Sequence, residues 1–405
     1  MATTVSAVQT LVNQFIQDTS TVSVTAADRL AAISMAAAEL LTELNLPQSV
    51  LSYNFSYYDG INYYKLSSDI PSHIEPGELR RKAGLNTRAV PFSRKDPNEM
   101  NYIIDSGSGE DAFAIEQRDG SQYLVINHQS AYSAALVHDC DSLTNNGTWA
   151  VDATNSDATN LTLDDVEYTQ GSAGFNFDID VSQSGNNRAT ISTSDMTAID
   201  MSDDENLSSL VFDVYIPDVT YISSFTTYWG DSASAYWSGS ATTEFNGNAF
   251  VAGWNTVKVD WADTTMTGSP DATDIDYIRI DMNYNASQGD DTDFRIDNIR
   301  MIRPETLTYL YQSSYVGANS SGTKLLAFTA TADVPFYSGA FDHFNIAVAR
   351  RAAAILFDQM GMHADADREN GYYTNEINKY RKKFPSVHQK ESKRFKTKWS
   401  SFRRR

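Results

Sequence analysis

The sequence has a single cysteine, Cys140, and too few basic residues to balance its acids. One cysteine excludes an internal disulfide framework and any zinc site built from several cysteines. Lys and Arg number 31 against 52 Asp and Glu, so the chain of 405 residues carries a formal net charge of -21. General nucleic-acid binders and proteins that dock on anionic membranes have broadly basic surfaces, so both classes are disfavoured.

Long apolar runs and the compact motifs of common enzymes are also missing. No run of 18 apolar residues predicts a membrane-spanning helix, and residues 1–6 lack a basic segment before an apolar core. We therefore expect no signal peptide and a protein made in a cytoplasm. The six histidines are scattered, with no HExxH, GxSxG or phosphate-binding glycine loop. No carboxylate pair for glycoside hydrolysis can be selected among so many acids, so we predict a protein that is not an enzyme and requires no cofactor.

The charge is distributed unevenly along the chain. Residues 139–303 hold 28 acidic and 6 basic residues, whereas residues 379–405 hold twelve Lys and Arg and one acid. Such steps in composition fall at domain boundaries or tails. Three roles stay open for the basic arm: docking on a partner protein, contact with nucleic acid, or solubility. Its candidate partner-binding residues are Lys379, Arg381, Lys382, Lys383, Lys393, Arg394, Phe395, Lys396, Lys398, Trp399, Phe402, Arg403, Arg404 and Arg405.

Hydrophobic periodicity changes twice along the chain. The first fifty residues show helical spacing, with a capping-box-like start at Thr25 and Asp28, and helical spacing returns over 342–384. Between them lie short β-prone runs, of which residues 101–104 are one example. From about residue 137 to 303, short strands of alternating apolar and polar residues are separated by Gly, Asn, Asp and Ser.

These patterns predict an α+β protein with an insertion. Residues 1–136 and 304–378 form a helical and β frame that is built from both chain ends. Residues 137–303 form an inserted all-β jelly-roll sandwich, which is easily inserted because the ends of a sandwich lie close together. Residues 379–405 form the basic arm.

Aromatic doublets are the clearest candidates for ligand binding in the middle segment. Tyr228-Trp229 and Tyr236-Trp237 flank the short loop 230–235. Flat rings stack on the CH groups of sugars, and nearby Asp and Asn accept hydroxyl hydrogens. Packing of these aromatics in the sandwich core is the alternative. Alternation along a strand predicts that at most one residue of each doublet is exposed.

Acidic pairs in the same segment have two interpretations. Asp139 and Asp141 flank Cys140, and Asp178 and Asp180 flank Ile179. Oxygen ligands suit Ca²⁺, but the spacing matches no EF-hand or calcium repeat. The pairs are therefore either part of a structural calcium site or solvated acidic faces.

The middle segment resembles the carbohydrate-binding modules of jelly-roll type. The resemblance is carried by Asp141–Trp149, Gly171–Phe177, Gly253-Trp-Asn255 and the closing Arg295-Ile-Asp-Asn-Ile299. It implies sugar binding and a structural calcium near the first and last strands, for which Asp139 and Asp297 are the matching positions. Such modules also decorate phage virion proteins.

The frame is similar to the head–tail adaptor proteins of tailed phages. The similarity rests on the N-terminal helix pair, on the small-residue helix Phe344–Leu356, and on Ala364–Tyr380 with its spaced tyrosines before a basic end. It implies a virion protein that forms a ring, usually of twelve copies, below the portal, with portal and tail or nozzle proteins as partners. DNA would pass through the ring without specific binding.

The resulting prediction is a structural adaptor that docks through its basic arm and carries a projecting sandwich. The alternative is a glycan-binding host-attachment protein that uses the sandwich aromatics Tyr228, Trp229, Tyr236 and Trp237.

Overall fold

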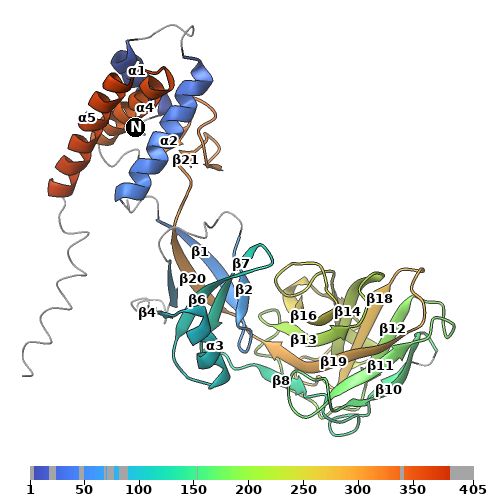
Figure 1. The fold of residues 1–405 in the computed structure, drawn as a ribbon. Coiled ribbons are helices and arrows are strands. Elements are labelled where there is room, and N and C mark those ends of the chain that lie inside the picture. The colour runs from blue at the N-terminus through green and yellow to red at the C-terminus, as the bar shows by residue number, and fades with distance from the viewer. Residues whose placement is uncertain are drawn as a thin grey trace, which may run out of the picture. The chain divides into compact units, whose positions relative to one another are not determined.

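The chain folds into two compact units in the computed structural model (Figure 1). Residues 1–53, 67–78 and 309–405 make up the first unit, and residues 54–66 and 79–308 make up the second. The division falls within strands β1 (Val50–Tyr57) and β20 (Glu305–Gln312). The residues that the structure describes are 4–17, 24–44, 50–67, 70, 77–81, 90–152, 154–337 and 342–383. Within these ranges, no helix is both long and apolar enough to cross a membrane.

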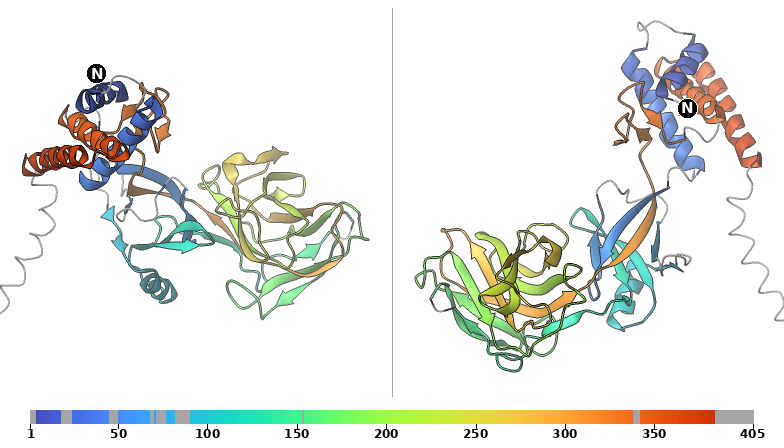
Figure 2. Two further views of the ribbon diagram at one scale, coloured as in Figure 1. Left: turned by 45° about the horizontal axis from the view of Figure 1, so that its top comes forward. Right: turned by 180° about the vertical axis from the view of Figure 1, so that it is seen from behind.

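Four helices from both chain ends form the first unit, as Figure 2 shows. They are α1 (Val5–Ile16), α2 (Ala26–Leu44), α4 (Asp342–Gln359) and α5 (His363–Lys383). The predicted capping box starts α2, because Asp28 accepts a hydrogen bond from the Thr25 amide (3.0 Å) and Thr25 Oγ1 accepts one from the Asp28 amide (3.1 Å). A left-handed Gly361 follows α4, with φ of +75°.

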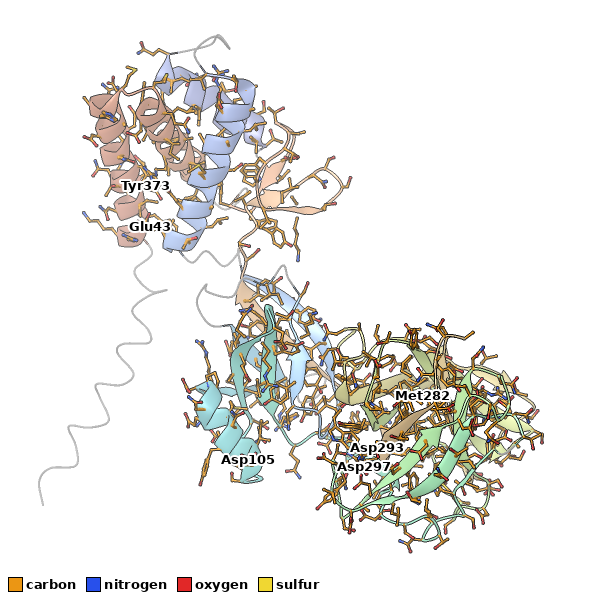
Figure 3. The ribbon with its side chains drawn as sticks, turned by 45° about the vertical axis from the view of Figure 1, so that its right-hand side comes forward. Glu43, Asp105, Met282, Asp293, Asp297 and Tyr373 are labelled. Atoms are coloured by element: carbon orange, nitrogen blue, oxygen red, sulfur yellow. The ribbon has the colours of Figure 1, made fainter. Side chains whose placement is uncertain are left out.

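Small residues let these helices approach closely. Ala347, Ala349, Ala352 and Ala353 of α4 are buried in one core with apolar residues of α1 and α2. Polar bonds then join the two chain ends, since Tyr373 of α5 donates a 2.8 Å hydrogen bond to Glu43 of α2 (Figure 3). Three short strands complete the unit: β21 (Gly317–Ala318), β22 (Lys324–Leu325) and β23 (Val334–Pro335).

Two six-stranded antiparallel sheets dominate the second unit. The first sheet, called here the β13 sheet, has the order β10 (Ala158–Asp164), β11 (Gly174–Ile179), β19 (Asp291–Ile302), β13 (Ser209–Ile216) and β16 (Gly253–Asp260), with β8 (Ala135–His138) paired to β19. The second sheet, called here the β14 sheet, has the order β17 (Thr265–Thr267), β15 (Ala235–Ala241), β14 (Ile222–Ser232), β18 (Tyr277–Tyr284), β12 (Arg188–Thr193) and β9 (Ala150–Val151).

The inner faces of the two sheets share one hydrophobic core. Phe212 of β13 meets Phe225 of β14 edge to face, with ring centroids 6.0 Å apart. Burial alternates along the strands, so that Val257 and Val259 of β16 point inward while Thr256 and Lys258 point outward. This alternation is what the sequence pattern predicts for a β-sandwich. The described chain is therefore α+β, with a β-sandwich at residues 135–302.

Further strands and a helix extend the second unit beyond the sandwich. Strands β2 (Tyr63–Lys65), β7 (Ser121–Asn127), β6 (Ala112–Arg118) and β5 (Ser93–Arg94) form one sheet. Another is formed by β1, β20, β3 (Glu78–Arg81) and β4 (Val90–Pro91), of which β1 and β20 belong only in part to this unit. The strand predicted at residues 101–104 is wrong, because α3 (Pro97–Asp105) is a helix. Asp96 caps it by accepting the Asn98 amide, and Pro97 occupies its first turn.

The segments that precede the sandwich, residues 54–66 and 79–136, make most of their contacts within the second unit. His128, which is buried, lies between Asp111 (2.7 Å) and Glu305 (3.1 Å), and the Tyr57 hydroxyl donates to its carbonyl (2.7 Å). Residues 54–66 and 79–136, which we assigned to the frame, thus cluster with residues 137–303, and the first unit keeps mainly the helices.

Candidate functional site

The hairpin of β14 and β15 places the predicted aromatics on both faces of the β14 sheet. Trp229 pairs with Trp237 across the hairpin, and Gly230 pairs with Tyr236. Trp229 is fully buried and Trp237 is 5 % exposed, and both rings pack on Trp261. Tyr228 and Tyr236 point to the opposite, outer face, where they are half-buried. The predicted alternation is thus present in the structure.

This arrangement corrects two of the four predicted sugar-binding residues. Trp229 and Trp237 stabilise the sandwich core and offer no ring face to a ligand, because a residue offset by one position along a strand points to the other side of the sheet.

A third tyrosine joins the outer pair. Tyr228 and Tyr236 meet edge to face with centroids 5.3 Å apart, and Tyr277 of β18 lies 6.3 Å from Tyr236. Gly230 lies between Tyr236 and Tyr277 in the strand register. A Cβ at Gly230 would come within 2.3 Å of the Ala235 carbonyl oxygen, so the close packing here requires glycine.

A charged pair fixes the polar side of the tyrosine group. The guanidinium of Arg279 lies 4.9 Å from the Tyr228 ring centroid. It binds Asp281 through two hydrogen bonds of 2.7 and 2.8 Å. Asp281 is 1 % exposed and also accepts a hydrogen bond from Thr190 (2.7 Å), which leaves Arg279 little freedom to move.

The Tyr228 hydroxyl is tied to the charged pair. Burial, and next the charge of Asp281, raise the pKa of Tyr228 to about 12, and the hydroxyl also donates a hydrogen bond to Asp281. The ring of Tyr228 is therefore held in place beside Arg279.

Hydroxyl and amide groups continue the same face along the strands. Thr226 and Ser240 share a 2.8 Å hydrogen bond, and Asn283 donates to Thr226 (3.0 Å). We call this surface the tyrosine face, and its members are Thr226, Tyr228, Tyr236, Ser238, Ser240, Tyr277, Arg279 and Asn283.

Sequence reasoning missed the β18 contribution to this face. Tyr277, Arg279 and Asn283 lie on the same face of β18, where Tyr277 is buried and the other two are half-buried, and this period is visible in the sequence. Nothing in the sequence indicates that β18 pairs with β14, since the two strands are separated by β15, β16 and β17 along the chain.

The two predicted calcium residues have different surroundings (Figure 3 labels Asp297). Asp297 is fully buried, and its Oδ2 accepts hydrogen bonds from Thr169 N (2.6 Å), Thr169 Oγ1 (2.8 Å) and Gln170 N (2.9 Å). Its Oδ1 has no partner among the described residues. Asp139 is half-buried and accepts the Asp141 amide (3.2 Å).

The described residues do not assemble a carboxylate cluster for the metal. No group of three or more His, Cys, Asp or Glu in the described ranges could hold a metal ion. A calcium ion beside Asp297 would therefore need backbone oxygens as well, and calcium stays a prediction from the sequence.

The basic arm lies mostly outside the described residues. Lys379 pairs with Glu376 (2.6 Å), and Arg381 pairs with Glu43 (3.1 Å), both within the helical unit. Lys382 is exposed, and Lys383 ends α5. The members outside the described residues are Lys393, Arg394, Phe395, Lys396, Lys398, Trp399, Phe402, Arg403, Arg404 and Arg405.

No protein-family model and no curated protein sequence matches the chain. Among solved structures, it is similar to the carbohydrate-binding module CtCBM11, with 15% identity over 43% of this chain and 97% of that chain, at a TM-score of 0.30. A family 30 carbohydrate-binding module from a Clostridium thermocellum cellulosomal cellulase matches with 11% identity, 42% and 96% coverage and a TM-score of 0.30. An exo-β-agarase matches with 14% identity over 42% of this chain, at a TM-score of 0.30.

The chain spans a quarter of the agarase structure that it matches. TM-scores near 0.3 are too low to assign a fold, so the β-sandwich is defined by its own strand order and core. These comparisons give no support to the resemblance of the frame to head–tail adaptors.

Proposed function

We propose that the protein binds neutral polysaccharide through the tyrosine face. The observation that carries this proposal is the outward pair Tyr228 and Tyr236, held beside the fixed Arg279. A sugar ring has apolar CH faces and polar hydroxyl edges, so it needs rings and hydrogen-bonding groups side by side.

The charge of the face suits a neutral ligand. Asp281 is saturated by Arg279 and Thr190, and Arg188 lies 3.8 Å from it. Asp152 lies close enough to Arg279 for the guanidinium charge to help lower the pKa of this carboxyl. The two guanidiniums are thus matched by two carboxylates, and the remaining N–H groups of Arg279 serve as hydrogen-bond donors without an unbalanced positive charge. An acidic polymer would gain little from such a site.

The shape of the face suits an extended chain. The outward groups lie on three adjacent strands, from Tyr236 on β15 through Tyr228 on β14 to Arg279 on β18. Hydroxyl and amide groups at Thr226, Ser240 and Asn283 continue this surface away from the rings. A polymer can therefore contact rings and polar groups at successive sugar units.

The test is a binding titration with a panel of soluble β-glucan, mannan and agar-type galactan. We expect wild-type protein to bind at least one member, and Tyr228→Ala and Tyr236→Ala each to weaken that binding about tenfold, which corresponds to about 1.4 kcal/mol. The matched control is Tyr102→Ala on α3, a tyrosine that is 74 % exposed and lies off the sandwich. Equal binding by all three variants would contradict the proposal.

Adaptor assembly, a dodecameric ring, portal and tail partners and a virion location stay predictions from the sequence, as does the absence of enzymatic activity. The arm that would carry docking lies largely outside the described residues, so the structure offers no geometry for that role.

A further inference from the structure

A polar pocket lies on the outer side of the β13 sheet, on the far side of the sandwich from the tyrosine face. It encloses about 330 Å³. Residues of the sandwich strands line it together with the turn 60–63, which belongs to the smaller sheets of the same unit. The proposed glycan site does not use this pocket, so a function for it would be a second one.

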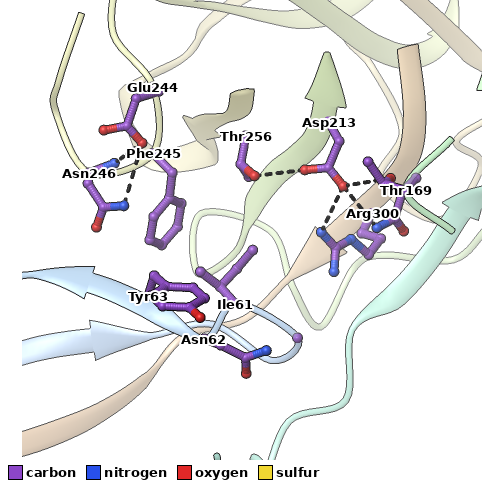
Figure 4. A pocket seen from close by; sticks show the side chains of 12 residues that line it. Ile61, Asn62, Tyr63, Thr169, Asp213, Glu244, Phe245, Asn246, Thr256 and Arg300 are labelled. Carbon is purple, nitrogen blue, oxygen red and sulfur yellow. Dashed lines mark hydrogen bonds and ion pairs between the residues drawn. The ribbon is translucent and has the colours of Figure 1, made fainter. Parts of the chain in front are cut away.

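One wall of the pocket carries charged and polar groups from neighbouring strands (Figure 4). Asp213 of β13 accepts hydrogen bonds from Thr256 (2.7 Å) and Asn298 (3.2 Å). Thr169 Oγ1 lies 3.1 Å from Asp213 but is nearer to Asp297, to which it donates its proton (2.8 Å). Two strands, β16 and β19, therefore hold the Asp213 carboxylate in place.

Arg300 beside it is less well satisfied. Its Nη2 lies 3.9 Å from Asp213 Oδ2, which is beyond hydrogen-bond distance, and its Nε is buried without a partner. A ligand hydroxyl group between the two side chains could accept a hydrogen bond from Arg300 and donate one to Asp213. Such a hydroxyl would satisfy both side chains at once. Gly60, with φ of +78°, packs against the guanidinium, because a Cβ there would lie 2.9 Å from Arg300 Nη1.

The opposite wall is aromatic and rigid. Figure 4 shows Phe245 and Tyr63 on one side of Ile61, with Asp213 and Arg300 on its other side. Phe245 meets Tyr58 and Tyr64 edge to face at 5.3 and 5.6 Å, and Arg118 lies 4.0 Å from the Tyr63 ring centroid. The rings are thus fixed before any ligand arrives, which lowers the entropic cost of binding.

We propose that this pocket binds a single neutral sugar unit or a polyol of similar size. An aromatic wall facing a carboxylate and a guanidinium matches the apolar face and the hydroxyl edge of one sugar ring. Two carboxylates, Asp213 and Glu244, and one guanidinium line the pocket, so an anion is disfavoured. Its volume of about 330 Å³ is at the lower end of the ~300–1,000 Å³ of ligand pockets, which matches a single sugar unit.

The experiment measures saturation transfer by NMR from the full-length protein to glucose, galactose, mannose, N-acetylglucosamine and glycerol. We expect transfer to at least one of these in the wild type. Ile61→Trp, which fills the pocket, should abolish it, and Phe245→Ala should weaken it at least tenfold. The matched control is Val166→Trp, at an exposed loop position outside the pocket.

A milder variant keeps the test valid if Ile61→Trp fails to fold. Thr256→Val has the same shape but removes the hydrogen bond that positions Asp213, so it should weaken binding in a protein whose thermal unfolding matches the wild type. No transfer to any of the five probes, or transfer unchanged in Ile61→Trp, would overturn the proposal.

The two proposed sites can fail separately. Tyr228→Ala should leave the monosaccharide signal intact, and Ile61→Trp should leave polysaccharide binding intact. Loss of the monosaccharide signal in Tyr228→Ala would assign it to the tyrosine face and contradict the second site.

Discussion

The two outer faces of the sandwich differ in what covers them. The tyrosine face of the β14 sheet is open, with half-buried rings at Tyr228 and Tyr236 on neighbouring strands and the buried Tyr277 beside them. The outer side of the β13 sheet is partly closed, because Tyr58 hydrogen-bonds to Ser209 and Asp260 and the turn 60–63 roofs a pocket. One scaffold thus has an open outer face, where we propose that a polymer binds, and a partly open pocket, where we propose that a small ligand binds.

The comparison also separates two kinds of aromatic residue that are adjacent in the sequence. Tyr228 and Trp229 differ by one position, yet Tyr228 points to the outer face of the sheet and Trp229 fills the core. The pleat of the strand alone decides this, because successive side chains point to opposite faces.

The largest expected effect separates stability from binding at these two positions. Trp229→Ala should lower the free energy of unfolding by about 3–5 kcal/mol, because it removes a fully buried ring that packs on Trp261. Tyr228→Ala, which is half-buried, should lower it by less than half as much. Urea unfolding followed by tryptophan fluorescence and circular dichroism gives both values. Equal losses for both variants would show that Tyr228 is a core residue.

The next effect concerns the charged pair under the tyrosine face. Asp281→Asn should cost about 3 kcal/mol, since it leaves the largely buried Arg279 without its carboxylate partner. The same variant should also weaken polysaccharide binding, because Arg279 loses its fixed position beside Tyr228. Unfolding and binding measurements on the same preparation test this. A stable variant with unchanged affinity would separate Arg279 from the site.

How far the sequence predicts this molecule depends on the range of the interactions. The α2 cap at Thr25 and Asp28, the helix ends and the strand alternation are local, and the sequence shows them directly. The helix α3 was missed because the apolar run at residues 101–104 outweighed the local cap at Asp96. The sequence also predicts a frame built from both chain ends, and α1, α2 and α4 share one core in the structure.

The functional surfaces needed long-range information. Two of the three face tyrosines are visible as doublets in the sequence, but Tyr277 joins them only through the pairing of β18 with β14. The pocket unites residues 60–63 with Asp213 and Arg300, which are far apart in the chain. Strand pairing and the docking of a distant turn leave no periodic signal, so the sequence contained no sign of this pocket.

The smallest expected effect is a pH dependence of stability, and it distinguishes the buried carboxylates of the two sheets. Asp281 has arginine partners, whereas Asp297 relies on hydrogen bonds from Thr169 and Gln170, and burial raises its pKa above the usual 3.8. The folded state therefore favours protonated Asp297. Its stabilising contribution is present below the unfolded pKa and is lost as the pH rises through the raised folded value.

Asp297→Asn should flatten this pH dependence. In buffer with a chelator, the variant should lose less stability than the wild type between about pH 4 and pH 7. Urea midpoints across this range measure the effect. If Ca²⁺ stabilises the wild type at pH 7 but does not stabilise Asp297→Asn, the result would instead favour the calcium site predicted from the sequence.

The most direct measurement is a polysaccharide titration of three proteins side by side: the wild type, the Tyr228→Ala/Tyr236→Ala double variant and Ile61→Trp. We predict saturable binding by the wild type and by Ile61→Trp, and affinity reduced at least about tenfold in the double variant, since the two rings are in contact and their effects do not simply add. Unchanged affinity in the double variant, or no binding of any polysaccharide by the wild type, would contradict a glycan-binding role for the tyrosine face.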